Sequence, residues 1–348
     1  MPDASTGTPP APQPVRLADY RPFGFEIDHV ALHFTLHPTR TRVRATIQFR
    51  PNPLTEDRNF FLHGEGLTAI TFKIDGQDIA PKLTEGGLTA TVPDAPFTWE
   101  AEVEINPEAN TALEGLYMSN GMYCTQCEAE GFRKITYYPD RPDVMAPFDV
   151  TIDSDLPVLL SNGNPLTGAE NARFPSGIHA NSASAWSDPH RKPAYLFALV
   201  AGDLRAVSDS FTTAAGRNVD LNIWVREGDE PRCSYAMDAL KRSMRWDETE
   251  YGREYDLDVF NIVAVDDFNM GAMENKGLNV FNSKYVLASP DTATDRDYAF
   301  IEAIVAHEYF HNWTGNRITC RDWFQLCLKD GLTVFREQQF SASQRSAP

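Results

Sequence analysis

The sequence has little positive charge, few cysteines and no long apolar run. Its 31 lysine and arginine residues are outnumbered by 49 acidic residues, which gives a formal net charge of −18 at pH 7. This balance argues against a nucleic-acid partner, because nucleic-acid-binding proteins present a basic surface. No stretch reaches the roughly 18 consecutive apolar residues of a transmembrane helix, so we expect no membrane partner either.

The cysteines and the N-terminal stretch bear on the compartment. Five cysteines in 348 residues do not suggest the paired framework of a small secreted domain. The opening MPDASTGTPPAPQPV has neither the basic region nor the apolar core of a secretory signal. A reducing, cytoplasmic location is therefore expected. Cys124 and Cys127 could form a redox pair or half of a zinc site, but no second C-x-x-C occurs, so we interpret them as packed thiols.

The first part of the chain has the pattern of β-strands. Residues 1–14 are rich in Pro, Ala and Thr and are expected to be flexible. Beyond them, apolar residues alternate with polar ones, which is typical of half-buried strands, and Asp75-Gly76 is a hairpin turn signal. We therefore predict a mainly antiparallel β domain over residues 15–203. The alternating segments are 30–36, 43–49, 70–74 and 148–152.

After Gly202 the pattern changes to a mixture of helices and strands. Met237, Leu240 and Met244 recur at helical spacing, in a helix expected to end near Gly252. Residues 259–265 read as a buried strand, and 295–313 as a helix whose acidic start suits the helix dipole. We predict an α+β fold in which residues 204–348 form a second domain that contains the chemistry.

This second helix carries the motif H-E-x-x-H, formed by His307, Glu308 and His311. Positions i and i+4 lie on one face of a helix, so the two imidazoles can bind one zinc ion at about 2.0–2.1 Å. Glu308 could then take a proton from a zinc-activated water. The five-residue pattern also occurs by chance, but here it lies on an expected helix, which is the context that it requires.

A catalytic zinc site needs a third protein ligand. The segment HNWTGNR after the motif supplies no further histidine, so a carboxylate is expected. Asp330 is the leading candidate, since 18 residues separate it from His311 and it ends a stretch, 321–329, that could form another helix. Asp322 and Glu337 are alternatives on chemistry alone.

Three longer segments resemble the bacterial aminopeptidase N family, the alanyl aminopeptidases of the gluzincin class of zinc metallopeptidases. The resemblance corresponds to the N-terminal portion of these proteins. It implies an N-terminal antiparallel β-sandwich or saddle-like domain, followed by the first part of a thermolysin-like zinc peptidase domain. The segments are YCTQCEAEGFRKITYYPDRPDV, FNMGAMENKGLNVFNSKYVLA and HEYFHNWTGNRITCRDWFQLCLKDGLTVF.

The resemblance implies one zinc ion per chain, bound by His307, His311 and the residue at position 330, with Glu308 as general base. The family has a glutamate where this sequence has Asp330. Aspartate is shorter by one methylene, which removes about 1.5 Å of reach. We expect zinc still to be held, with altered affinity.

The resemblance also implies a site for the free α-amino group of a peptide. Glu274 matches the glutamate that holds this group, and Gln126 and Glu128 match residues that complete the anchor and the first side-chain pocket. Carboxylates are suited to an ammonium ion, and Met270 matches a flexible methionine that cushions the pocket. The backbone of two further residues, Gly271 and Ala272, would line the substrate.

We therefore expect a zinc aminopeptidase that releases N-terminal residues from short peptides with broad specificity. A non-catalytic homologue with a weakened metal site is an alternative. It is supported by Asp330 and by the absence, after Asp330, of the tyrosine that stabilises the oxyanion in the family. A zinc endopeptidase is a second alternative, although Glu128 and Glu274 would close the end of its cleft. We expect the chain alone to be weakly active or inactive, and its full-length parent to be a monomer.

Overall fold

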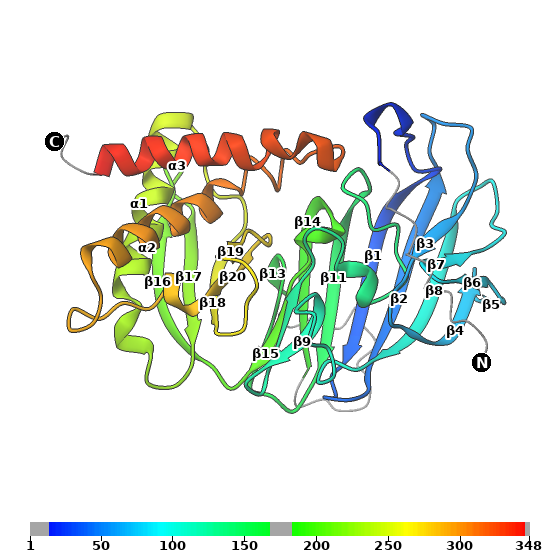
Figure 1. Cartoon of the computed structure of the whole chain (residues 1–348), viewed down its shortest axis with the longest axis horizontal. Coiled ribbons are helices and arrows are strands. Elements are labelled where there is room, and N and C mark those ends of the chain that lie inside the picture. Colours follow the sequence, from blue (N-terminus) through cyan, green and yellow to red (C-terminus); the bar gives the residue numbers. More distant parts are fainter. Residues whose placement is uncertain (1–13, 168–182, 345–348) are drawn as a thin grey trace, which may run out of the picture.

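The computed structural model describes residues 14–167 and 183–344, so the flexibility expected for residues 1–14 falls almost wholly outside it. The described chain is mostly β-sheet with few helices. An N-terminal β domain is followed by a sheet with helices packed on one face, and the two parts lie side by side (Figure 1). This arrangement confirms the α+β class expected from the sequence.

An eight-stranded sheet dominates the β domain, in the order β13-β14-β11-β1-β2-β8-β4-β5. The alternation read from the sequence is confirmed in β1 and β2, which pair antiparallel with Val30 opposite Ile47, both fully buried. The strands are β1 Phe25–Thr35, β2 Thr41–Pro51, β4 Thr68–Ile74, β5 Gln77–Asp78, β8 Phe97–Ile105, β11 Met145–Asp153, β13 Asn164–Pro165 and β14 Ala183–Pro193.

The turn predicted at Asp75-Gly76 joins β4 to β5. Both residues have positive φ, 51° and 76°, as the favoured two-residue hairpin turns require. The prediction of a mainly antiparallel domain is confirmed, and β1 with β11 is a parallel pair within it. Only a short hairpin forces two neighbouring strands to run antiparallel. The connection from β1 to β11 is long and includes other strands, so it allows the parallel direction.

Smaller sheets complete the β domain. A four-stranded sheet has the order β12-β15-β10-β9, and a three-stranded sheet has the order β3-β7-β6. Gln126 is the last residue of β10. Their bounds are β3 Phe61–His63, β6 Lys82–Thr84, β7 Gly87–Thr89, β9 Gly115–Ser119, β10 Met122–Gln126, β12 Val158–Ser161 and β15 Leu199–Gly202, with short 3-10 turns at Leu17–Asp19, Phe132–Lys134 and Ala194–Leu196.

The second part is built on a five-stranded sheet, in the order β16-β17-β18-β20-β19. The predicted buried strand is confirmed as β18, and its side chains alternate between two cores. Val263 and Val265 join the core of the β domain, whereas Ile262 and Ala264 pack with the helices. The elements are β16 Arg205–Thr212, β17 Asn218–Val225, β18 Val259–Val265, β19 Ala272–Met273, β20 Leu278–Asn282, α1 Ser234–Tyr251, α2 Asp295–Phe310 and α3 Asp330–Gln344, with 3-10 turns at Glu230–Arg232 and Ser283–Tyr285.

The helix ends follow local chemistry. Gly252 ends α1 in the left-handed conformation, as predicted. A capping box between Thr294 and Asp297 begins α2. This helix ends at Phe310 rather than at residue 313, because Asn312 and Trp313 bond three residues back, to Tyr309 and Phe310, in a tight turn. None of the helices within the described residues is long and apolar enough to cross a bilayer.

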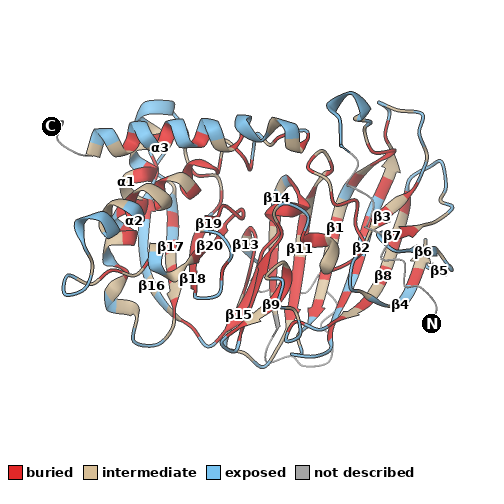
Figure 2. Cartoon of the chain, in the orientation of Figure 1, coloured by how far each residue is buried: buried red, intermediate tan, exposed pale blue. Residues whose placement is uncertain are grey.

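The prediction of a helix over residues 321–329 is wrong in its bounds. Only a 3-10 helix, η7 (Trp323–Leu328), forms there, and α3 begins at Asp330. An acidic residue is favoured in the first turn of a helix by the dipole. Figure 2 colours much of α3 as exposed, and this region exposes large apolar side chains. They are Ile318, Phe324, Leu326, Leu328, Leu332, Val334 and Phe335.

Candidate metal centre and amine-binding site

The C-terminal end of α2 and the first residue of α3 bring three potential metal ligands together. His307 and His311 lie one turn apart, with 2.9 Å between their Nε2 atoms. The Oδ1 atom of Asp330 lies 3.6 Å from His311 Nε2. One ligand atom from each residue lies within 4.8 Å of the other two. In the described chain, neither Asp322 nor Glu337 joins such a group with these histidines.

Hydrogen bonds orient the ring of His311. Its Nδ1 atom lies 2.8 Å from the carbonyl oxygen of Thr314 and 3.2 Å from Oγ1 of Thr333. When Nδ1 carries the proton and donates it to this carbonyl, Nε2 is unprotonated. The lone pair of Nε2 is then available on the side of His307 and Asp330. Burial lowers the pKa of His311 to about 4 and also lowers that of His307. Both rings are therefore neutral near pH 7, the form that binds a metal.

Glu308 lies on the same helix, between the two histidines in sequence, and is buried. Its Oε2 atom has no hydrogen-bond partner within the described residues. Burial, followed by the charge of Glu274, raises the pKa of Glu308 well above its usual range. Ligand atoms of Glu308, His311 and Glu274 lie within 4.8 Å of one another. A buried carboxylate oxygen without a protein partner in such a place fits a zinc ion with its water.

The two carboxylates expected to bind an α-amino group come from different parts of the fold. Glu128 follows β10 in the β domain, and Glu274 follows β19 in the second part. Both contact Lys329, whose Nζ atom lies 2.5 Å from Glu128 Oε1 and 2.7 Å from Glu274 Oε1. The Lys329 side chain is only 1% exposed. The sequence analysis did not identify Lys329 as a site residue. Its position next to Asp330 in the sequence was the one signal that could have indicated it.

The two carboxylates differ in acidity. Burial opposes ionisation of Glu274, but His311 and Lys329 outweigh it and lower its pKa to about 2. Burial and the charge of Glu274 raise the pKa of Glu128 to about 7, although Lys329 acts in the opposite direction. Near neutral pH, Glu274 is therefore the permanent anion of the pair.

The other expected substrate-binding residues lie close in sequence to one of these two carboxylates. Gln126 ends β10 and is fully buried, and neither its Oε1 nor its Nε2 atom has a hydrogen-bond partner within the described residues. Ala272 pairs with Phe281 in the sheet, and the carbonyl of Gly271 accepts from Asn282 N at 3.0 Å. Met270 is 49% exposed.

Comparison with known proteins identifies the family. The profile described as "Peptidase M1 N-terminal domain" matches residues 26–196, and the one described as "Peptidase family M1 domain" matches residues 235–347. The chain belongs to the M1 peptidase family.

Relatives of this M1 chain include two curated bacterial proteins named aminopeptidase N. The Caulobacter vibrioides protein is 57% identical over 97% of the chain, and the Escherichia coli protein 52% identical over 95%. Aminopeptidase A of Legionella pneumophila, solved with aspartic acid, superposes with a TM-score of 0.88 at 34% identity over 94% of the chain. The chain spans 38–39% of the length of these three proteins. The aminopeptidase N resemblance seen in the sequence is thereby confirmed.

The C-x-x-C of this M1 chain is buried. Cys124 and Cys127 are both fully buried and form no disulfide. Burial raises the pKa of the Cys124 thiol to about 12 and that of Cys127 well above its usual range. Such thiols are unreactive at neutral pH, which supports their interpretation as packed side chains.

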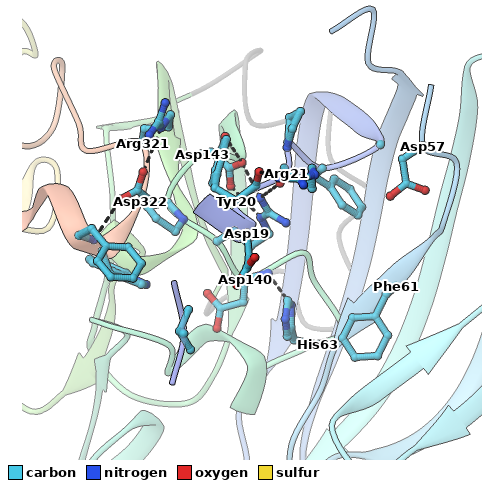
Figure 3. Close-up of a pocket in the computed structure, with 18 of the residues that line it drawn as sticks. Asp19, Tyr20, Arg21, Asp57, Phe61, His63, Asp140, Asp143, Arg321 and Asp322 are labelled. Atoms are coloured by element: carbon cyan, nitrogen blue, oxygen red, sulfur yellow. Dashed lines mark hydrogen bonds and ion pairs between the residues drawn. The ribbon is translucent and has the colours of Figure 1, made fainter. Parts of the chain in front are cut away.

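A separate cavity of about 500 Å³ lies between the start of the described chain and the segment before η7 (Figure 3). Some of its charged groups form ion pairs with one another. Asp143 accepts from Tyr20 and from Arg141, and Arg321 pairs with Asp322. We therefore place the chemistry of this M1 chain at the histidine pair and not in this cavity.

Proposed function

We propose that the chain carries the zinc-binding and amine-binding part of an aminopeptidase that releases N-terminal residues from short peptides. One observation carries the proposal. Three potential ligands, His307, His311 and Asp330, converge near Glu308, which has an unpartnered carboxylate oxygen, and Lys329, which directly precedes α3, contacts both Glu128 and Glu274. The aminopeptidase names of the bacterial relatives agree with this assignment.

The residues at the metal centre have complementary tasks. His307, His311 and Asp330 would hold one zinc ion. When bound, that ion would supply Lewis acidity, polarising a peptide carbonyl and making a water molecule more acidic. Glu308 would accept the proton of the attacking water at its free oxygen and pass it to the leaving amine. Burial keeps competing water away from this carboxylate.

The amine anchor would select a chain end. Glu274, with Glu128, would bind the α-ammonium by charge-assisted hydrogen bonds, and the buried amide of Gln126 offers both a donor and an acceptor nearby. An exposed, flexible Met270 suits first residues of several shapes. The carboxylates would also exclude a chain that continues past the anchor, which disfavours an endopeptidase.

A chimera tests this function. We would replace the matching segment of Caulobacter vibrioides aminopeptidase N with residues 14–344 and compare cleavage of a short peptide with that of its N-acetylated form. The chimera should cleave only the free peptide, and Glu308→Gln in the same chimera should abolish turnover. Cleavage of the acetylated peptide would favour an endopeptidase. An inactive chimera that folds and binds zinc would favour a non-catalytic homologue.

The isolated chain should behave differently. We propose that it binds about one zinc ion but turns over an aminoacyl anilide weakly or not at all, because it matches less than half the length of its relatives and exposes the apolar residues of η7 and α3. Elemental analysis measures the zinc content, and an anilide assay measures the turnover.

The unpaired cysteines are consistent with the cytoplasmic location that we propose. We also propose that the full-length parent protein is a monomer and that it has neither a nucleic-acid nor a membrane partner.

A further inference from the structure

Two asparagines, Asn312 and Asn316, follow the histidine that ends the metal motif, and each is only 3% exposed. Both contact the loop of residues 274–277, which joins β19 to β20. The loop begins with Glu274, just beyond the paired part of β19, whose ladder with β20 ends at Met273. Strand pairing therefore does not set the position of Glu274, and contacts with neighbouring segments must do so.

Asn316 joins the main chain of the two proposed sites. Its side-chain Nδ2 atom donates to the carbonyl oxygen of Glu274 at 2.9 Å. Its backbone N–H donates to the carbonyl oxygen of His311, also at 2.9 Å. The carboxylate of Glu274 lies 3.9 Å from His311 Nδ1. A shift of the loop would therefore change the relation between the amine anchor and a potential metal ligand.

A glycine allows this turn to close onto the histidine. Gly315 has a φ of 144°, and a Cβ atom there would lie 2.8 Å from His311 Nδ1. Glycine accepts such a conformation and such an approach because it has no Cβ. The turn thus places Asn316 directly against the main chain of His311.

Asn312 holds the same loop at a second point. Its Oδ1 atom accepts from Nζ of Lys276 at 2.6 Å, and its Nδ2 atom donates to Asp256 at 3.3 Å. The Lys276 side chain is 1% exposed and forms an ion pair with Asp256. A buried ammonium needs such partners. The loop is therefore held to the segment after α2 on both sides of Asn275.

We infer that Asn312 and Asn316 are positioning residues of the amine anchor, which hold Glu274 in a fixed place relative to His311. This inference rests on the proposed function. Lys329 contacts one carboxylate oxygen of Glu274 at 2.7 Å, whereas the asparagines fix the main chain that carries this carboxylate. A site that is ordered before binding loses less entropy when the ligand arrives. Loss of the asparagine contacts should therefore weaken ammonium binding.

Binding of L-leucinamide to the full 348-residue chain tests the inference. The titration is carried out at pH 7, where an α-amino group is mostly protonated, and in a chelator, so that the probe cannot coordinate a metal. Leucine has as many side-chain heavy atoms as asparagine but cannot donate. Asn316→Leu should raise the dissociation constant by about tenfold or more, equivalent to about 1.4 kcal/mol. Asn312→Leu, which acts through Lys276, should raise it by about threefold.

A matched control separates positioning from stability. Asn52 of the β domain is also buried and donates through Nδ2 to the carbonyl oxygen of Phe23 at 2.8 Å. Asn52→Leu should lower the free energy of unfolding in urea but leave the dissociation constant unchanged. A chain that loses one buried hydrogen bond is still folded without denaturant, so a role in stability alone would not change binding by the Asn316 variant either.

The outcomes distinguish the inference from the proposed function. N-acetyl-L-leucinamide, which lacks the ammonium, should bind to none of the chains. If the wild type binds the free amine and Asn316→Leu binds it equally tightly, the inference is overturned while the amine anchor stands. Should Asn316→Leu fail to fold, unchanged binding by Asn312→Leu overturns it in the same way. If the wild type does not bind the free amine at millimolar concentration, both the inference and the proposed amine anchor are overturned.

Discussion

Arg336 of α3 forms an ion pair with Asp247 of α1, and both side chains are buried. The same guanidinium donates to the carbonyl of Phe310, the last residue of α2, at 2.9 Å. One arginine thus joins the helix that carries the two histidines to the helix that begins with Asp330. We therefore expect the geometry of the proposed metal centre to depend on this contact.

Replacement of Arg336 should therefore affect both stability and metal binding. Arg336→Met leaves Asp247 buried without its partner, which typically costs about 3–5 kcal/mol. We expect a loss of this size in urea unfolding, together with weaker zinc binding because the first turn of α3 is less well fixed. The double variant with Asp247→Leu should recover part of the loss. Arg205→Met, at exposed pairs with Asp203 and Glu227, should cost less than about 1 kcal/mol, and a similar cost for Arg336→Met would contradict the prediction.

Asp330 is the proposed third ligand, at a position where the sequence resemblance implies a glutamate, and the effect of its side-chain length can be tested directly. Asp330→Asn should raise the zinc dissociation constant by roughly tenfold or more, about 1.4 kcal/mol, because it loses the anionic oxygen. Asp330→Glu should bind zinc at least as tightly as the wild type, since the longer side chain reaches further. Competition with a chromophoric chelator measures both values.

The control for this test is Asp322, an acidic residue close in sequence whose carboxylate accepts from Phe324 N at 3.0 Å. Asp322→Asn can keep this bond and should leave zinc affinity unchanged. Zinc affinity that is the same in Asp330→Asn and in the wild type would show that another group is the third ligand.

The sequence predicted those parts of the fold that depend on neighbouring residues. Alternation in residues 43–49 marked the buried face of β2, Asp75-Gly76 marked a hairpin, and Gly252 marked a helix end. Each of these signals acts within a few residues. The His307 and His311 pair was also predictable, because one helical turn is sufficient to bring the two rings together.

Long-range features could not be predicted in this way. The parallel pairing of β1 with β11 depends on how the intervening strands pack, and the start of α3 at Asp330 depends on contacts with α1 and α2. Lys329 was missed because a single lysine gives no periodic signal. Its role appears only when Glu128, Glu274 and Tyr195 are brought from three separate segments.

Gln126 offers a test that separates stability from binding. Its amide is fully buried and, within the described residues, lacks hydrogen-bond partners. An unpaired buried polar group costs about 1–3 kcal/mol. Gln126→Met has a similar volume without the amide, so we expect unfolding free energy to be unchanged or to rise by up to that amount, while L-leucinamide binds more weakly. A destabilised variant with unchanged binding would show that Gln126 has only a packing role.

His63 should make stability depend on pH. The ring is largely buried, and its Nδ1 atom accepts from the backbone N–H of Asp140 at 3.2 Å. Burial, with a smaller contribution from the charge of Arg133, lowers the pKa of His63 from 6.5 to about 4. Between these values the unfolded chain binds the proton and the folded chain does not. The contribution of His63 is therefore present above about pH 6.5 and is lost as the pH falls through that window.

The expected loss reaches about 3 kcal/mol by pH 4, because one pKa unit corresponds to about 1.4 kcal/mol. Asp140 acts with the opposite sign, since burial raises its pKa to about 6, so the wild-type curve alone does not isolate the histidine. His63→Asn retains an acceptor for the Asp140 N–H but cannot titrate. Urea unfolding at several pH values should show that the difference in stability between wild type and variant shrinks or reverses toward pH 4. Parallel curves over this range would mean that His63 titrates alike in the folded and unfolded chains.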